Sequence, residues 1–334
     1  MSSAMRAVIG EALGGPEAYA MTEVPRRAPG AGEVEVAVAV AGMGYVDALI
    51  AAGGYQVKPP PPYCPSIEFA GRISAVGEGV EGFTVGQRVA ASGFGGGLAE
   101  FAVVSAHTAS PIPDALDAGA AAGFITNYLT AWHGLLDRAE LRAGETVLVL
   151  GAAGGVGVAA VQVARLAGAR VIAGASSEAK RAFALEQGAH EALDYLEPEW
   201  RKTLKAMTGG RGVDVVFDPV GGDLLEPAFR SLAWRGRHLV IGFTGGPIPA
   251  LPVNLALLKG AALMGVDLRQ FSSVHEVAAA NTMRAQLFAA VERGDLVPPV
   301  GARFAFEDFR DAMALALQRD GVGKTVVVVD EENA

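Results

Sequence analysis

The sequence is poor in the residues that form disulfides, metal clusters and nucleic-acid-binding surfaces. It has one cysteine, Cys64, among 334 residues, so neither an intramolecular disulfide nor a four-cysteine zinc site can form. Its five histidines are scattered without the paired spacing of metal ligands. Lys and Arg form no stripe and the net charge is −9, which argues against binding to nucleic acid or to an anionic membrane surface.

Long apolar runs are absent as well. No run reaches the roughly 18 residues that a transmembrane helix needs, and residues 1–10 lack the apolar core of a signal peptide. We therefore expect a cytoplasmic protein. Apolar side chains are abundant, at 51% of all residues, and so is glycine, with 44 residues. The glycines are dispersed, which is typical of turns and close backbone contacts in a globular chain of about two domains.

The first part of the chain has the pattern of short strands. Charged and apolar residues alternate at the start of Glu33–Ala41, which predicts a half-buried strand, and two more strands are predicted at Glu68–Val76 and Gln87–Ala91. Turn-forming Gly and Pro residues separate them. Many short strands with such turns predict a barrel or a sandwich.

The pattern changes near residue 117. Ala118–Leu136 is apolar and rich in alanine, which predicts a helix. Strands and helices then alternate, and repeated β-α-β units give a parallel sheet with helices on both faces. The predicted helices start near Gly155, Glu178, Glu199, Leu224 and Asn254, and the predicted strands are Thr146–Leu150, Val171–Gly174, Ala192–Asp194, Val213–Phe217, His238–Ile241 and Ala262–Val266.

The alternation stops after residue 267. One long helix is predicted at Val274–Arg293 and a shorter one at Phe309–Gln318, and the chain ends in an apolar strand, Thr325–Val329. Such an apolar strand needs a partner. No low-complexity linker separates the parts of the chain, so we predict two interlocked domains.

The strongest motif is a glycine-rich turn within TVLVLGAAGGVGVAA, residues 146–160. A predicted strand precedes it and a predicted helix follows, the setting in which N–H groups at a helix N-terminus bind a dinucleotide pyrophosphate. Ala152 stands where the G-x-G-x-x-G pattern has its first glycine. The alternative is a turn that needs glycine for backbone reasons only. The predicted contacts are Ala153, Gly154, Gly155, Val156 and Gly157.

The residues after the second strand of this part favour NADPH over NADH. An NAD site usually places an acid there to bind the ribose 2′-OH, whereas Ala175 occupies that place here and no acid follows the strand directly. Ser176, Lys180 and Tyr195 offer hydroxyls and a cation, which suit a 2′-phosphate. The alternatives are that Lys180 is a solvated helix residue and that Ser176 is a helix N-cap.

With these residues in place, the chain resembles the medium-chain dehydrogenase/reductase superfamily, and within it the zinc-less quinone oxidoreductase (zeta-crystallin-like) branch. The resemblance covers about residues 5–329. It implies an α/β protein with a GroES-like β-barrel catalytic domain at 1–123, a Rossmann NADPH-binding domain at 124–267, and a return to the catalytic domain at 268–334. Besides the glycine-rich turn, it rests on Gly42–Asp47, Gly71–Val80, Phe83–Val89, Asp214–Gly222, Leu257–Gly260 and Gly323-Lys324.

The resemblance also implies site residues and a homodimer. Family members often dimerise through the last Rossmann strand, here Ala262–Val266. Tyr55 matches a tyrosine at the mouth of the substrate cleft. Beyond the glycine-rich turn, the residues implied to lie at the cofactor are Thr126, Thr130, Lys180, Tyr195, Phe243, Thr244 and Arg319.

Two departures from the family concern the metal. Zinc alcohol dehydrogenases of the superfamily carry Cys where this chain has Gly44 and His where it has Ile67. Glu68 remains, but one carboxylate makes no zinc site, so no metal is expected. Quinone oxidoreductases usually carry Asn at the Gly44 position, and its loss leaves the identity of the substrate open.

Alcohol oxidation is disfavoured without a Lewis acid, so we predict hydride transfer from NADPH to a quinone. Tyr55 or Tyr45 is predicted to donate a hydrogen bond to the carbonyl oxygen, with Thr126 as a further catalytic candidate. The alternative is that both tyrosines pack as aromatics between domains. Two other functions stay open: reduction of α,β-unsaturated ketones, aldehydes or enoyl thioesters, and NADPH binding without catalysis.

Overall fold

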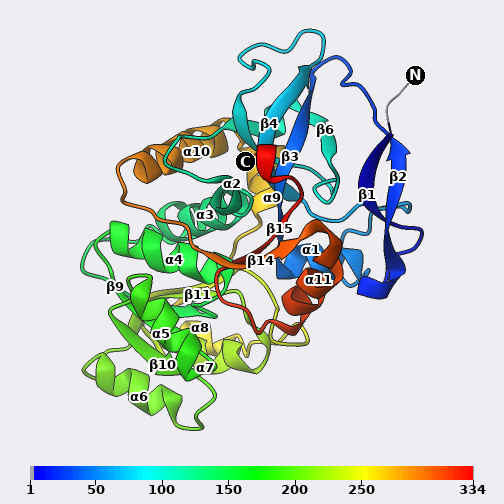
Figure 1. Cartoon of the computed structure of the whole chain (residues 1–334). Helices are drawn as coiled ribbons and strands as arrows, with labels where there is room; N and C mark the ends of the chain where they lie inside the picture. The colour runs from blue at the N-terminus through cyan, green and yellow to red at the C-terminus, as the bar shows by residue number, and fades with distance from the viewer. Residues whose placement is uncertain (1–3, 334) are drawn as a thin grey trace. The chain divides into compact units, whose positions relative to one another are not determined.

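The computed structural model describes residues 4–333 and divides them into two compact units (Figure 1). One unit holds the chain up to Ile125 together with the chain from Val297 onward, and the other is Thr126–Leu296. From the sequence we expect the chain to enter the second unit after residue 123 and to leave it after residue 267. In the structure it leaves the second unit after Leu296, later than expected. The segment after residue 267 stays with the second unit because the Phe271 ring stacks on His133, with centroids 3.8 Å apart.

The first unit is organised by a mainly antiparallel sheet. Its strand order is β14-β15-β3-β4-β5-β7, with β6 paired to β3, while β1 and β2 form a separate pair. The strands are β1 (Ala4–Gly10), β2 (Tyr19–Pro25), β3 (Glu33–Met43), β4 (Glu68–Val76), β5 (Arg88–Ser92), β6 (Phe101–Ser105), β7 (Ala109–Pro111), β14 (Val300–Ala305) and β15 (Lys324–Val328).

The prediction that β3 is half-buried is wrong, because every residue of the strand after Glu33 is buried. Glu35 is accommodated by partners from elsewhere in the chain. Arg26 Nε donates to its carboxylate at 2.9 Å and Ser74 Oγ at 2.7 Å. Burial alone would raise the pKa of Glu35, but the hydrogen bonds from Arg26 and Ser74 outweigh it and lower that pKa.

The last strand of the chain has the partners that its apolar sequence requires. β15 pairs antiparallel with β3, so that Thr325 lies opposite Met43, and parallel with β14. The helix before it, α11, spans Phe309–Gln318 as predicted. The other helices of this unit, α1 (Tyr45–Ala51) and α2 (Ala118–Ala121), are short.

The second unit contains a six-stranded sheet in the order β10-β9-β8-β11-β12-β13, and all of its strand pairs are parallel. Numbered along the chain, this is the 3-2-1-4-5-6 order of dinucleotide-binding sheets. All six predicted strands are present, although β12 begins earlier than expected. The strands are β8 (Thr146–Leu150), β9 (Arg170–Ala175), β10 (Glu191–Asp194), β11 (Val213–Asp218), β12 (Leu232–Val240) and β13 (Ala262–Gly265).

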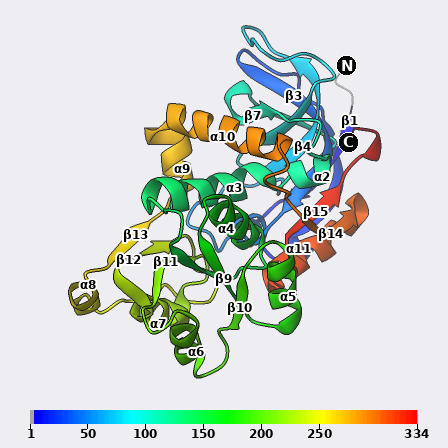
Figure 2. The same cartoon turned by 90° about the vertical axis from the view of Figure 1, so that its left-hand side faces the viewer.

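Helices connect these strands, and each begins within one residue of its predicted start (Figure 2). Because parallel crossovers are right-handed, the helices that lead away from β8 in the two directions cover opposite faces of the sheet. Within residues 4–333, no helix is both long and apolar enough to cross a membrane. The helices are α4 (Gly155–Leu166), α5 (Glu178–Glu186), α6 (Trp200–Met207), α7 (Leu225–Arg230) and α8 (Asn254–Lys259).

Two long predicted helices are interrupted. Ala118–Leu136 is not one helix, because α2 ends at Ala121 and α3 (Phe124–Trp132) follows, then a π-helical segment at 133–138. At the break, the Lys324 side chain lies where a Cβ on Gly123 would be, at 2.4 Å. The predicted helix Val274–Arg293 is α10 (Val277–Glu292), preceded by α9 (Leu268–Gln270) and a π-helical segment at 271–275.

Candidate functional site

The glycine-rich turn lies where the strand order of the second unit reverses. β8 is buried throughout and ends at Leu150, and Gly151 turns the chain with φ +60°, in the left-handed region. Gly154 is the N-cap of α4, a helix of 12 residues, and as a glycine it has no side chain to cap that end. The first turn of α4 therefore begins in the place where open α/β sheets bind a ligand through backbone N–H groups.

The glycines of this turn have different surroundings. A Cβ on Gly157 would lie 2.1 Å from the carbonyl oxygen of Gly151 and 2.8 Å from Cα of Ala152, so Gly157 is required for packing α4 on the turn. A Cβ on Gly154 would meet nothing closer than 3.5 Å. Backbone packing alone therefore explains Gly157 but gives no reason for glycine at 154.

The turn contacts the loop that follows β11, which in turn contacts the loop that follows β12. A Cβ on Gly151 would lie 3.2 Å from Cγ2 of Val220 and 3.6 Å from Cγ of Pro219. Thr244 binds the same loop, since its N–H and its hydroxyl both donate to the Pro219 carbonyl oxygen, at 3.2 and 3.1 Å. Thus the glycine-rich turn and the predicted cofactor residues Phe243 and Thr244 share one neighbour, the loop after β11.

The residues predicted at the 2′-phosphate follow two adjacent strands. Asp194 at the end of β10 lies opposite Ala175 at the end of β9, so Ser176 and Tyr195 both follow at the carboxyl edge of the sheet. Tyr195 packs over β9, because a Cβ on Gly174 would lie 3.2 Å from its ring carbon Cδ1. The structure therefore brings Ser176 and Tyr195 to the same edge.

The N-cap of α5 is Ser177, whose Oγ accepts a hydrogen bond from the N–H of Lys180 at 3.3 Å. The interpretation of Ser176 as the N-cap is therefore wrong, because the helix begins one residue later than that role requires. Lys180 lies on the first turn of α5 and is half-buried rather than fully solvated.

Arg181 is a residue of this edge that the sequence analysis missed. Its Nη1 lies 2.6 Å from Oδ2 of Asp194 and 3.5 Å from the carbonyl oxygen of Ala175. The ion pair neutralises the acid at the end of β10, which would otherwise repel a phosphate. The available signal was an arginine beside Lys180 and an acid ending the third strand.

The two threonines of α3 differ in their surroundings. Thr130 is buried, and its hydroxyl donates to the carbonyl oxygen of Thr126 at 2.7 Å. The Thr130 proton is therefore committed to the helix backbone, so toward a ligand this hydroxyl can only accept. Thr126 is half-buried, at the start of the second unit.

The predicted tyrosines and Arg319 belong to the first unit. Tyr45 is the first residue of α1 and Tyr55 follows that helix; both are half-buried. The Tyr55 ring packs against the apolar core of this unit. Within residues 4–333, neither hydroxyl has a hydrogen-bond partner, so each is available as a donor. Arg319 ends α11 in the left-handed region, with φ +61°.

The positions that carry zinc ligands in related dehydrogenases do not fit a metal here. Gly44 and Ile67 are instead joined by Asp47, whose Oδ2 accepts from Gly44 N at 2.7 Å and whose Oδ1 accepts from Ile67 N at 2.8 Å. Nζ of Lys324 lies 3.5 Å from the same Oδ2. A fixed ammonium opposes a cation at this place, and residues 4–333 contain no group of three His, Cys, Asp or Glu side chains that could hold a metal ion.

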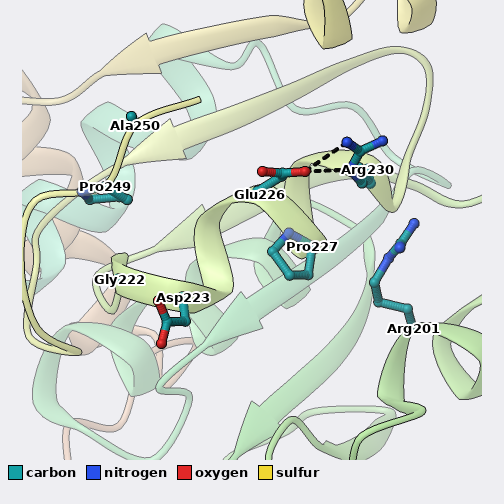
Figure 3. A pocket seen from close by; sticks show the side chains of 8 residues that line it. All are labelled: Arg201, Gly222, Asp223, Glu226, Pro227, Arg230, Pro249 and Ala250. Atoms are coloured by element: carbon teal, nitrogen blue, oxygen red, sulfur yellow. Dashed lines mark hydrogen bonds and ion pairs between the residues drawn. The ribbon is translucent and has the colours of Figure 1, made fainter. Parts of the chain in front are cut away.

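A polar pocket of about 480 Å³ lies elsewhere on the second unit, over α6, α7 and the loop after β12 (Figure 3). None of the residues predicted to bind the cofactor lines it. Its charges are partly paired, because Arg230 Nη2 lies 2.7 Å from Oε1 of Glu226. We therefore do not assign the cofactor to this pocket. Its lining residues are Arg201, Gly222, Asp223, Glu226, Pro227, Arg230, Pro249 and Ala250.

Known proteins are similar to this chain over nearly all of its length. Residues 30–114 match the family model of the alcohol dehydrogenase GroES-like domain, and residues 155–283 match that of the zinc-binding dehydrogenase. Quinone oxidoreductase-like protein 2 of Rattus norvegicus is 35% identical over 306 residues, which cover 91% of this chain and 87% of that protein. Quinone oxidoreductase of Rattus norvegicus is 34% identical over 328 residues, or 97% and 98%.

A solved structure shows the same fold. Escherichia coli quinone oxidoreductase complexed with NADPH superposes with a TM-score of 0.89 at 26% identity, covering 97% of this chain and 100% of that one. The predicted fold class, an α/β chain with a GroES-like domain and a Rossmann-like parallel sheet, is confirmed.

Proposed function

We propose, on the premise that this chain belongs to the medium-chain dehydrogenase/reductase family and to its quinone oxidoreductase-like branch, that it transfers hydride from NADPH to a quinone without a metal ion. The observation that carries the proposal is the α4 N-terminus, where the N-cap is a glycine without a capping side chain and a Cβ on Gly154 would meet no atom closer than 3.5 Å. A pyrophosphate fits that place, and the similar Escherichia coli enzyme was solved with NADPH.

The second unit supplies most of the groups that would hold NADPH. Backbone N–H groups of the turn from Ala153 to Gly157 would bind the pyrophosphate, with Val156 inside the first helical turn. Thr126, Thr130, Phe243 and Thr244, and Arg319 of the first unit, are proposed as further contacts. When bound, NADPH supplies the hydride. At the 2′-phosphate, the proposed contacts are Ser176, Lys180 and Tyr195, with Arg181 neutralising Asp194 beside them.

We assign proton donation to the acceptor to two tyrosines of the first unit. A carbonyl oxygen that gains negative charge needs a hydrogen-bond donor when no Lewis acid is present. Tyr45 and Tyr55 have hydroxyls without a partner among residues 4–333, and a tyrosine hydroxyl donates readily to a developing oxyanion. The Asp47–Lys324 ion pair lies at Gly44, a position where zinc dehydrogenases carry a ligand, which supports a metal-independent reaction.

One panel of assays tests the substrate class. NADPH oxidation is followed with benzoquinones, with small enones and with an enoyl-CoA thioester as separate acceptors. We expect the highest kcat/KM with a benzoquinone. A higher value with an enone or thioester would make the chain an enoyl reductase instead, and tight NADPH binding without turnover on any acceptor would favour a binding protein.

Replacing Lys180 tests the choice of cofactor. We expect Lys180→Ala to raise the Kd for NADPH about 10- to 100-fold, because a charge-assisted hydrogen bond to the 2′-phosphate contributes about 1.5–3 kcal/mol. The Kd for NADH should not change. Lys202→Ala on the exposed face of α6, where Lys202 pairs with Glu199, is the matched control. Fluorescence titration measures both constants, and an unchanged NADPH Kd in Lys180→Ala would show that the pocket is misassigned.

Removing each tyrosine hydroxyl tests the proton donor. Tyr45→Phe or Tyr55→Phe should lower kcat for quinone reduction about 100-fold, the effect of losing one donor to a developing oxyanion. The Kd for NADPH should stay constant, because neither residue belongs to the unit that holds the pyrophosphate. Steady-state kinetics on both variants and on the double variant provide the check. Full turnover in the double variant would leave water as the donor.

We propose a homodimer formed through β13. Among the described residues this strand ends the sheet, next to β12, and apolar side chains on the two strands are exposed, with Leu263 of β13 at 46% and Trp234 of β12 at 71%. An apolar patch next to an open strand edge favours pairing with a second copy across a two-fold axis.

A charge at this edge should dissociate the dimer. Leu263→Asp places a carboxylate on β13. In a two-fold dimer the carboxylates of the two copies would lie near each other and repel. We expect the wild type to elute at twice the chain mass and the variant at the chain mass in size-exclusion chromatography with light scattering. Val85→Asp, on an exposed turn of the first unit, is the control. A monomeric wild type would refute the dimer.

A further inference from the structure

A buried histidine–carboxylate pair lies under the candidate cofactor edge and has no part in the function proposed above. His238 of β12 is 0% exposed and Asp218, the last residue of β11, is 1% exposed. Nε2 of His238 lies 2.9 Å from Oδ2 of Asp218. Both residues belong to the second unit, on strands that pair in parallel.

The second oxygen of Asp218 binds the loop that follows β11. Oδ1 accepts hydrogen bonds from the N–H of Val220 at 2.9 Å and from that of Gly221 at 2.7 Å. Gly221 has φ +61°, and a Cβ there would lie 2.9 Å from the ring of Phe243. One carboxylate thus joins His238 to a tight turn, residues 219–221, which packs directly against Phe243.

This turn supports both loops that are proposed to hold NADPH. On one side, Pro219 and Val220 lie against Gly151 of the glycine-rich turn. On the other side, the Pro219 carbonyl oxygen accepts from Thr244, and the Val220 carbonyl oxygen accepts from the N–H of Gly245 at 2.7 Å. A shift of the turn would therefore displace the glycine-rich turn and the Phe243–Thr244 loop together.

The hydrogen bond to Asp218 is what histidine contributes at position 238. Because the Asp218 carboxylate accepts, the proton between them lies on Nε2. Nδ1 is then left buried, with no partner among residues 4–333, and such an atom destabilises the folded state. The ring also packs beside Phe229, with centroids 6.1 Å apart, a contact that an apolar side chain would make as well. What histidine adds is one N–H aimed at Asp218.

We infer that His238 is a positioning residue for cofactor binding. Its N–H holds the Asp218 carboxylate in the orientation that lets Oδ1 bind Val220 and Gly221, and the turn so held aligns the glycine-rich turn with the Phe243–Thr244 loop. This role rests on the proposed function, since it requires NADPH to bind at that edge. Neither residue contacts the cofactor.

Two substitutions separate positioning from packing. His238→Phe keeps a ring of similar size and removes the N–H, whereas His238→Gln keeps an N–H donor near the position of Nε2. We expect His238→Phe to raise the Kd and KM for NADPH about tenfold, with kcat at saturating NADPH changed less. Its melting temperature should fall, because Oδ2 of the buried Asp218 carboxylate loses its donor. His238→Gln should bind NADPH within about threefold of the wild type. His238→Leu, which also removes the N–H, is measured in parallel in case the Phe ring fits poorly.

Hydrogen exchange of the cofactor-free protein provides a readout that does not depend on NADPH. The peptide that contains Val220 and Gly221 should exchange faster in His238→Phe than in the wild type or in His238→Gln. Unchanged exchange, or faster exchange with an unchanged NADPH Kd, would overturn the inference. If the wild type bound no NADPH while the exchange difference persisted, the proposed function would fail and the support of the turn by His238 would stand.

Discussion

Gly154→Val is expected to abolish tight NADPH binding while leaving the fold in place. Gly154 has φ −80° and ψ 169°, which any residue adopts, and a Cβ there would meet no atom closer than 3.5 Å. The new side chain would instead fill the space that a pyrophosphate needs at the α4 N-terminus. We expect the Kd for NADPH to rise by about 100-fold or more. The free energy of unfolding should fall by only about 1 kcal/mol, because valine is a poorer N-cap than glycine.

Gly157→Val is the comparison variant for this prediction, because it is expected to destabilise the fold. Its Cβ would lie 2.1 Å from the Gly151 carbonyl oxygen, so α4 must move from the turn, at a loss of about 3 kcal/mol in the free energy of unfolding. Calorimetric NADPH titration and thermal melting of both variants measure the two effects. A normal NADPH Kd in Gly154→Val would mean that no pyrophosphate lies at this turn.

Asp47→Ala is expected to lower the free energy of unfolding by about 3–5 kcal/mol, the usual result of breaking a buried ion pair. The Asp47 side chain is 3% exposed and that of Lys324 is 12% exposed. The variant would leave the ammonium of Lys324 buried without its partner. It would also leave the N–H groups of Gly44 and Ile67 without their acceptor.

The partner substitution makes this prediction sharper. Lys324→Met removes the ammonium and keeps much of its volume, and the Asp47→Ala/Lys324→Met double variant removes both charges. If the pair acts as described, the double variant loses less stability than the sum of the two single variants. Chemical denaturation of the three variants measures this coupling. Additive losses would show that Asp47 and Lys324 act independently.

The second unit was predictable from sequence almost element by element. Most of its strands contain a short apolar run, as in β8 and β9, and Gly155 and Glu178 were predicted as helix starts and are the first residues of α4 and α5. Local patterns of this kind contain the whole signal. The assignment of these strands to a Rossmann domain followed from the family resemblance rather than from these patterns.

The errors arose where a distant residue decides the local structure. The predicted helix after Asp117 breaks because Lys324, from the other end of the chain, packs against Gly123. The strand β3 is buried after Glu33, and its one buried charge, Glu35, is satisfied by Arg26 and Ser74. Neither contact can be predicted from the periodic pattern of the local sequence.

The residues of the candidate site also include some that the local sequence reveals and others that depend on distant contacts. The glycine-rich turn is continuous in sequence, and it was found there. The pairs Arg181–Asp194 and Asp218–His238 were missed because each is formed only when neighbouring strands or helices align. In the sequence, His238 is one of five scattered histidines, and only the sheet brings it to the end of β11.

Metal-free turnover tests the central claim most directly. The purified chain is treated with a chelator, its zinc content is measured, and NADPH absorbance is followed after addition of a benzoquinone. We expect NADPH to be oxidised at the same rate before and after chelation, by protein that contains no zinc. Activity that disappears with the metal and returns with added zinc, or no NADPH oxidation at all, would contradict a hydride transfer that depends on the dinucleotide alone.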